Sequence, residues 1–214
     1  MFKNLKNLVA PKTIQEANYA IYRMVKLSIF MTVFSLPWTI VNTFITFSTE
    51  TSFFFIIAFL LMIPNVMALF HFYETDDVTI KEYFFFLINN EFWKRVKVSL
   101  TITIITSFYL FDSYILIFLM DLKIITPILY ITFMFLAIAG VYAIIICNQE
   151  TIGWKKMIKK ATYISWRYIF STVLLFIILM VWVIIGYYIQ GINIILGNSI
   201  LWGIIYRIGL KKVK

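Results

Sequence analysis

The chain has very few of the polar residues from which catalytic and metal sites are usually built. Its 214 residues include one cysteine, Cys147, one histidine, His71, and ten Asp and Glu. One cysteine excludes a disulfide framework within the chain, and one Cys with one His cannot form a usual zinc site. We therefore expect no bound metal and no cofactor.

Catalytic and processing motifs are absent as well. The sequence has no Walker A loop, no G-x-G-x-x-G and no H-E-x-x-H, and His71 is the single candidate base for a Ser-His-Asp triad. We expect no catalytic residues and predict that the protein is not an enzyme. No apolar h-region precedes Lys26, and no small-residue cleavage site follows the first apolar run, so a removable signal peptide is not expected.

Apolar residues, by contrast, are in large excess. The chain is 62% hydrophobic and 14% charged, with a mean hydropathy of +0.91, whereas a soluble domain is about 45–50% apolar and about 25% charged. Its 22 Phe, 13 Tyr and 6 Trp provide more apolar surface than a core of this length could bury. The remainder has to face lipid, which predicts an all-α polytopic membrane protein whose first partner is the bilayer.

The apolar runs predict six transmembrane helices, each close to the length that a hydrocarbon core of about 30 Å requires. The uncharged stretch 169–206 is divided in two, since one helix of its 38 residues would be about 57 Å long. Pro37 should kink the first span. The predicted spans are 27–47, 52–73, 98–120, 124–147, 169–187 and 191–206.

Three segments outside the spans are expected to be helical and amphipathic. Residues 1–26 form a lead-in continuous with the first span, and Thr13 with Glu16 has the form of a capping box. Residues 74–97 and 151–167 connect later spans. With the N-terminus inside, these segments and the C-terminal tail hold 18 of the 19 Lys and Arg, which fits the positive-inside rule. The net charge of +9 is thus explained by topology with both termini cytoplasmic, and nucleic-acid binding is not expected.

Segment 151–167 has the clearest amphipathic pattern of the chain. Its apolar residues recur at helical spacing in one stripe, and its cations point the other way. A basic amphipathic helix between two spans is expected on the inner membrane surface, with its apolar face in the headgroup boundary. The stripe consists of Trp154, Met157, Ile158, Ala161, Ile164 and Ser165, and the opposite face carries Lys155, Lys156, Lys159, Lys160 and Arg167.

Two aromatic–basic clusters close the cytoplasmic segments. Trp93, Lys94 and Arg95 end the first, and Trp166 and Arg167 end the second. Such clusters are typical of interfacial anchors, whose rings lie at headgroup depth while the cations extend towards water. A role in docking a partner is equally compatible with these residues.

Asp112 is the one acidic residue within a predicted span. Intramembrane carboxylates are costly and often functional, which makes Asp112 a candidate for a transport pathway or proton relay. It also lies near the outer end of its span, where the interface, Tyr109 or Ser113 could satisfy it.

Five short motifs lie in the first two predicted spans and in the turn before the third. They are Ser35-Leu36-Pro37, Ile63-Pro64, Ala68-Leu69-Phe70, Phe92-Trp93-Lys94 and Val96-Lys97. These motifs resemble those of the YesL family, integral membrane proteins of Gram-positive bacteria. The resemblance implies a protein of the cell membrane that acts as an accessory component of carbohydrate uptake, beside the permease subunits of an ABC importer, with no established activity.

Three functions remain open at this point. The first is an accessory membrane protein whose cytoplasmic segments contact an importer. The second is a self-contained small transporter or channel in which Asp112 and the kinked spans line a path. The third is an immunity protein against a membrane-active peptide. The sequence does not indicate the oligomeric state.

Overall fold

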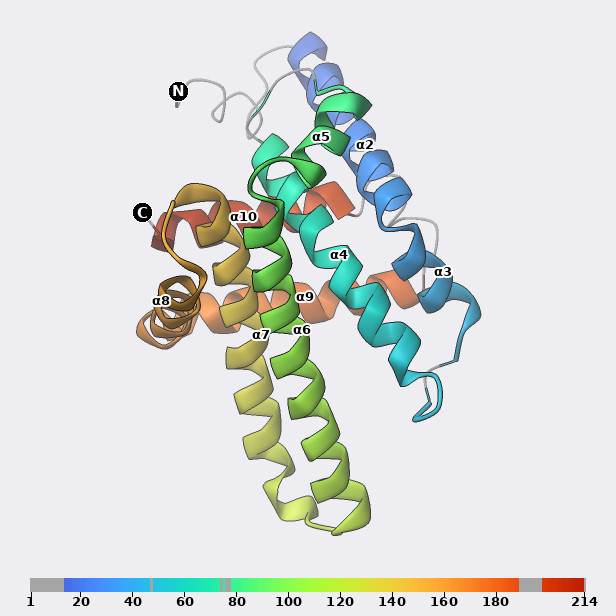
Figure 1. Cartoon of the computed structure of the whole chain (residues 1–214), viewed down its shortest axis with the longest axis vertical. Helices are drawn as coiled ribbons and strands as arrows, with labels where there is room; N and C mark the ends of the chain where they lie inside the picture. The colour runs from blue at the N-terminus through green and yellow to red at the C-terminus, as the bar shows by residue number, and fades with distance from the viewer. Residues whose placement is uncertain (1–13, 47, 74, 76–77, 189–197, 214) are drawn as a thin grey trace.

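The computed structural model describes residues 14–46, 48–73, 75, 78–188 and 198–213, and this part of the chain is all α-helical (Figure 1). Within it, short π-helical and 3-10 turns, Ile115–Leu119 and Lys123–Ile125, connect two of the helices. The predicted capping box at Thr13 lies outside the described residues. The nine α-helices of this part are α2 (Ile14–Phe34), α3 (Leu36–Phe44), α4 (Ser52–Phe72), α5 (Ile80–Ile88), α6 (Phe92–Tyr114), α7 (Thr126–Gln149), α8 (Trp154–Arg167), α9 (Ile169–Tyr188) and α10 (Asn198–Val213).

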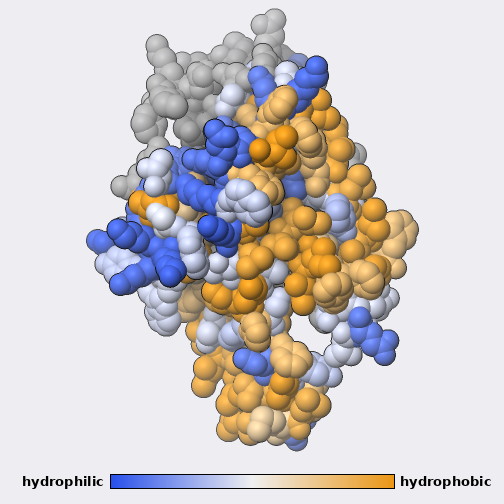
Figure 2. All heavy atoms as spheres, in the orientation of Figure 1, coloured by the Kyte–Doolittle hydropathy of each residue, from blue (hydrophilic) through white to orange (hydrophobic). Residues whose placement is uncertain are grey.

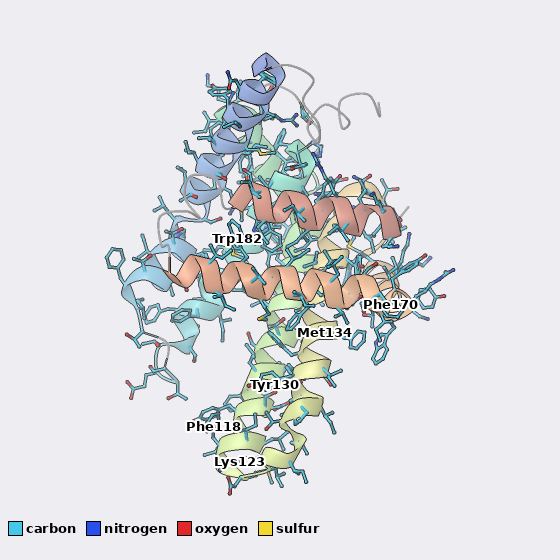
Figure 3. All side chains as sticks on the ribbon, turned by 180° about the vertical axis from the view of Figure 1, so that it is seen from behind. Phe118, Lys123, Tyr130, Met134, Phe170 and Trp182 are labelled. Carbon is cyan, nitrogen blue, oxygen red and sulfur yellow. The ribbon has the colours of Figure 1, made fainter. Side chains whose placement is uncertain are left out.

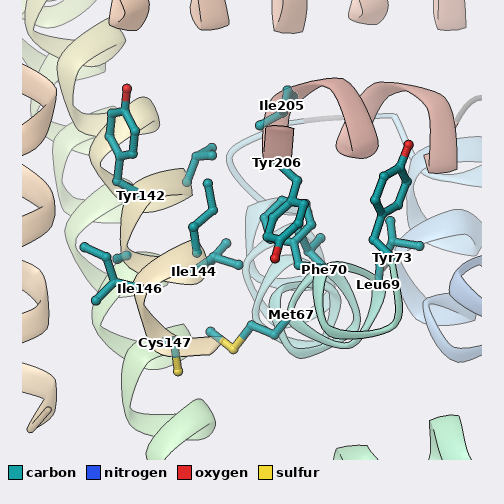
Figure 4. Close-up of a cluster of buried hydrophobic side chains, with 14 of the residues drawn as sticks. Met67, Leu69, Phe70, Tyr73, Tyr142, Ile144, Ile146, Cys147, Ile205 and Tyr206 are labelled. Carbon is teal, nitrogen blue, oxygen red and sulfur yellow. The ribbon is translucent and has the colours of Figure 1, made fainter. Parts of the chain in front are cut away.

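The core is built around the C-terminal halves of α4 and α7. Every residue from Asn65 to Phe70 is buried, and so is every residue from Val141 to Cys147. A helix that is apolar on all sides is covered either by neighbouring helices or by lipid, and here neighbouring helices cover these two halves. Figure 4 shows how Phe70 and Tyr206 meet between α4 and α10, with their ring centroids 5.0 Å apart.

The predicted first span is not one kinked helix but two helices. α2 ends at Phe34, α3 begins at Leu36, and the two are bent by 75°. Pro37 lies in the first turn of α3, where its missing N–H costs nothing. The break leaves the Phe34 carbonyl without its helical partner, and the Asn65 side-chain amide donates to it at 3.0 Å. The lead-in is nevertheless continuous with the span, as expected, because α2 already begins at Ile14.

α6 and α7 form a long antiparallel hairpin whose far half projects from the rest of the molecule (Figure 1). Asp121 turns the chain at its tip with a φ of 51°, a conformation that Asp adopts more readily than most residues. The helix that holds the third predicted span is longer than that span, since α6 starts at Phe92 and takes in the end of segment 74–97. That segment is therefore a short helix, α5, followed directly by α6.

α9 and α10 run side by side across the α6–α7 hairpin and not along it (Figure 3). α8 and α9 are bent by 97° at Tyr168, so α9 starts in a new direction. The helix of the last predicted span extends past the end of that span, because α10 continues from Asn198 to Val213. The predicted start of that span lies in 189–197, outside the described residues.

Three helices of the described residues are long and apolar enough to cross a membrane: Ser52–Phe72, Phe92–Leu119 and Lys123–Gln149. The number rises to five if each of the two bent pairs, α2 with α3 and α8 with α9, counts as one broken span. The prediction of an all-α fold is confirmed for the described residues, and three to five candidate spans suggest a multi-pass membrane protein.

Three cations on other helices satisfy the backbone carbonyls at the ends of α4, α5 and α7. From α2, Arg23 donates to the carbonyls of Phe72 and Tyr73 at 3.2 and 2.5 Å. From α6, Arg95 donates to the Phe86 carbonyl and Lys94 caps α7, as described below. The last carbonyls of a helix lack hydrogen-bond partners within the helix and carry a partial negative charge. A cation stabilises them because it donates hydrogen bonds and because it attracts this charge.

Candidate interaction surface

α8 has the predicted amphipathic character, but its apolar stripe packs on protein. Met157, Ala161, Ile164 and Ser165 are buried, mainly against α7. Further along, the Trp166 ring stacks flat on Phe135 of α7, with centroids 4.2 Å apart. The expectation that this stripe lies in the lipid headgroups therefore fails for these four buried residues. Trp154, at the start of the same stripe, is exposed.

This packing fixes the cations of α8 on the outer side of the molecule. We call Lys155, Lys156, Lys159 and Arg167 the basic face; all four are exposed. None of them forms an ion pair with an acid of the described residues. Figure 2 shows hydrophilic residues gathered on the side of the molecule where α8 lies. Because the helix beneath is held by its buried stripe, the basic face is a preformed surface and not a mobile segment.

Aromatic rings accompany two of these cations. The Lys155 ammonium lies 5.6 Å from the centre of the Trp154 ring. The Arg167 guanidinium lies 5.8 Å from Tyr163 and 5.6 Å from Tyr168. Exposed cation–π contacts are worth about 0.5–1 kcal/mol, enough to orient these side chains while their charges stay accessible.

Lys160, the remaining α8 cation, is already paired. Its ammonium forms an ion pair with the Glu150 carboxylate, and the Glu150 backbone oxygen accepts from Lys94 Nζ at 2.9 Å. Lys94 also donates to the Cys147 carbonyl at 3.1 Å. Glu150 thus joins the two predicted docking segments, which lie far apart in sequence. Glu150 binds one cation from each segment, Lys94 through its backbone oxygen and Lys160 through its carboxylate. These two lysines therefore stabilise the fold, and we do not count them among the residues that bind a partner.

Arg95 is also a structural residue. Its side chain is only 2% exposed and lies with its guanidinium 3.8 Å from the centre of the Phe86 ring. It donates to the Phe86 carbonyl and, at 2.8 Å, to Asn89 Oδ1, and Glu91 stands 3.8 Å away. The prediction of an interfacial anchor therefore fails for Arg95, although the neighbouring Trp93 is 69% exposed, as an anchor requires.

Asp112 lies on the projecting half of α6, with its side chain exposed. Neither predicted local partner engages it. The Tyr109 hydroxyl donates instead to the Leu129 carbonyl at 2.5 Å, and Ser113 Oγ is buried without a hydrogen bond. A shallow apolar groove between α2 and α5, lined by Phe34, Ile80, Lys81, Phe84 and Phe85, does not include Asp112.

Other residues of this region were missed by the sequence reasoning. Lys212 of α10 lies 5.0 Å from the Tyr168 ring, which places a second cationic helix end beside the basic face. The sequence places the C-terminal tail on the inner side without indicating a neighbour, and the packing of α10 brings Lys212 to Tyr168. Glu150 was also missed as a junction, since a single acid before a helix carries no distinctive signal.

The described residues hold no group of three or more His, Cys, Asp or Glu that could bind a metal. Comparisons with protein-family models, with curated proteins and with solved structures gave no match to this chain. The arrangement of the basic face can bind an acidic surface by charge and hydrogen bonding.

Proposed function

We propose that the chain is a non-enzymatic membrane protein that docks, through the basic face of α8, on an acidic surface of a membrane complex. One observation carries the proposal: α8 is held against α7 by its buried stripe and presents exposed cations that pair with no acid of the described residues. Because the helix is already in place, binding costs only the freedom of the side chains, and charge complementarity favours an acidic partner.

The resemblance to the YesL family supports one choice of partner. We propose the permease subunits of an ABC-type carbohydrate importer in the cell membrane of a Gram-positive bacterium. The proposed topology has six spans and both termini inside, which places the basic face in the cytoplasm. Its fifth and sixth crossings would use α9 and α10, which would have to turn in the membrane from their course across the α6–α7 hairpin (Figure 3).

Charge reversal of the basic face tests the proposal. Lys155→Glu, Lys156→Glu and Lys159→Glu, combined in one variant, should abolish co-purification of the importer subunits from gently solubilised membranes. Lys160 stays unchanged because its pairing with Glu150 holds α8 in place. The matched control reverses Lys81, an exposed cation of α5, and should co-purify normally. Unchanged co-purification of the triple variant would refute docking through α8.

The transporter alternative depends on Asp112, which would have to line a path through the protein. Its exposed position on the projecting hairpin instead favours contact with the surroundings of the protein. Flux in liposomes that is lost in Asp112→Asn would restore the alternative. No feature of the described residues favours immunity against a peptide over docking.

A further inference from the structure

The far half of the α6–α7 hairpin is almost bare of protein contacts. In the most apolar stretch of the α6 span, 6% of the residues are buried, against 44% in α4 and 39% in the span that contains α7. Figure 3 shows Phe118, Lys123 and Tyr130 on this half, away from α9. Figure 2 shows its surface as largely hydrophobic. If this surface were wholly apolar, lipid alone would be enough to cover it.

Asp112 interrupts this apolar surface. Among the described residues its carboxylate has neither an ion pair nor a hydrogen bond, and its exposed neighbours Phe108 and Phe111 are apolar. The helical path continues for seven more residues to Leu119, roughly 10 Å along the axis. A bare carboxylate within the apolar part of a bilayer is costly, and such groups usually pair with another charge.

A second copy of this chain is a poor source for the missing countercharge. Lys123 is the one Lys or Arg between Lys97 and Lys155, and it already pairs with Asp121 at 2.8 Å at the hairpin tip. A two-fold contact through this face would also set one Asp112 against another, which like charges oppose. Charge complementarity therefore selects a different chain.

We infer that the Asp112 side of the α6–α7 hairpin is a docking site for a transmembrane helix of another protein, one that carries a lysine or arginine at matching depth. The apolar residues around Asp112 pack on the partner helix, and the two charges neutralise each other out of water. This surface lies on the part of the hairpin that points away from α8 (Figure 1), so the inference is independent of the basic face.

Designed peptides in liposomes test the inference without knowledge of the natural partner. The full chain carries a donor dye on a terminal tag. Leu/Ala transmembrane peptides carry an acceptor dye and either one lysine or one leucine at the depth of Asp112. Energy transfer should show that the lysine peptide binds about threefold to thirtyfold more tightly, the range expected for a polar contact between membrane helices.

Variants of the full chain complete the test. Asp112→Asn should remove the preference for the lysine peptide and Asp112→Glu should keep it. The matched control Asp121→Asn alters the acid at the tip and should leave the preference unchanged. Equal binding of the two peptides, or a preference that survives in Asp112→Asn, would overturn the inference. So would self-association of the chain that depends on Asp112, because a second copy would then be the occupant.

Discussion

Replacement of Arg95 by methionine tests whether this residue stabilises the corner between α5 and α6 or anchors the protein at the membrane surface. The variant loses the hydrogen bonds to the Phe86 carbonyl and to Asn89 Oδ1. Bonds from a charged donor are worth about 1.5–3 kcal/mol each. The ion pair with Glu91 adds little, because Glu91 is 51% exposed. Since methionine keeps part of the packing on the Phe86 ring, we expect a loss of about 3 kcal/mol in the free energy of unfolding.

Lys97→Met is the matched control, since Lys97 lies on the same helix and is exposed. Surface substitutions of this kind usually change stability by no more than about 0.5 kcal/mol. Both variants are compared with the parent chain by reversible unfolding in mixed micelles, followed by helical circular dichroism. If Arg95 were an anchor at the membrane surface, the two variants would unfold alike. That outcome would refute the account of the α5–α6 corner given above.

Two further predictions concern other parts of the fold. Hydrogen bonds from Thr79 hold the pKa of the Glu82 carboxyl below its usual value, so the capping box should stabilise α5 above about pH 4.5 and lose this effect as the pH falls through the lowered pKa. Hydrogen exchange of α5 against pH measures this, and Glu82→Gln should flatten the dependence. A Cβ at Gly203 would collide with the buried Tyr73 ring, so Gly203→Ala should destabilise the protein by about 1–3 kcal/mol. Thermal unfolding measures the loss, and Gly153→Ala, which meets nothing within 4 Å, should not reproduce it.

Helix content and the amphipathic pattern of α8 were predictable from sequence, because both depend on local periodicity. The stripe through Met157 and Ile164 is buried as the spacing indicates. What it is buried against could not be predicted. The groove beside α7 and a headgroup layer accept the same apolar side chains, and only the path of the chain after Gln149 decides between them.

The prediction of interfacial anchors failed for cations that bind the carbonyls at a helix end, because the same residue types occur in both settings. Lys94 and Arg95 follow two aromatic residues, which is also the pattern of an anchor. Their carbonyl partners lie on α7 and α5. Nothing in the sequence near those helix ends shows that their last carbonyls take a donor from another helix. The break at Ser35 was similarly underestimated. Proline predicts a lost hydrogen bond, but it does not predict a 75° bend or that Asn65, distant in sequence, donates to the freed Phe34 carbonyl.

The cations that bind carbonyls at helix ends give a structural reason for conservation of positive charge in related sequences. Arg23, Lys94 and Arg95 each bind carbonyls of a helix other than their own. Selection for folding alone would keep a positive charge at these three positions, whatever the protein binds. Among the lysines of α8, by contrast, Lys155, Lys156 and Lys159 form no ion pair with an acid in the part of the chain that the structure describes, so selection on them would act through contacts outside the described fold. Invariance at 23, 94 and 95 would report on assembly of the helices, and invariance at 155, 156 and 159 would report on a partner.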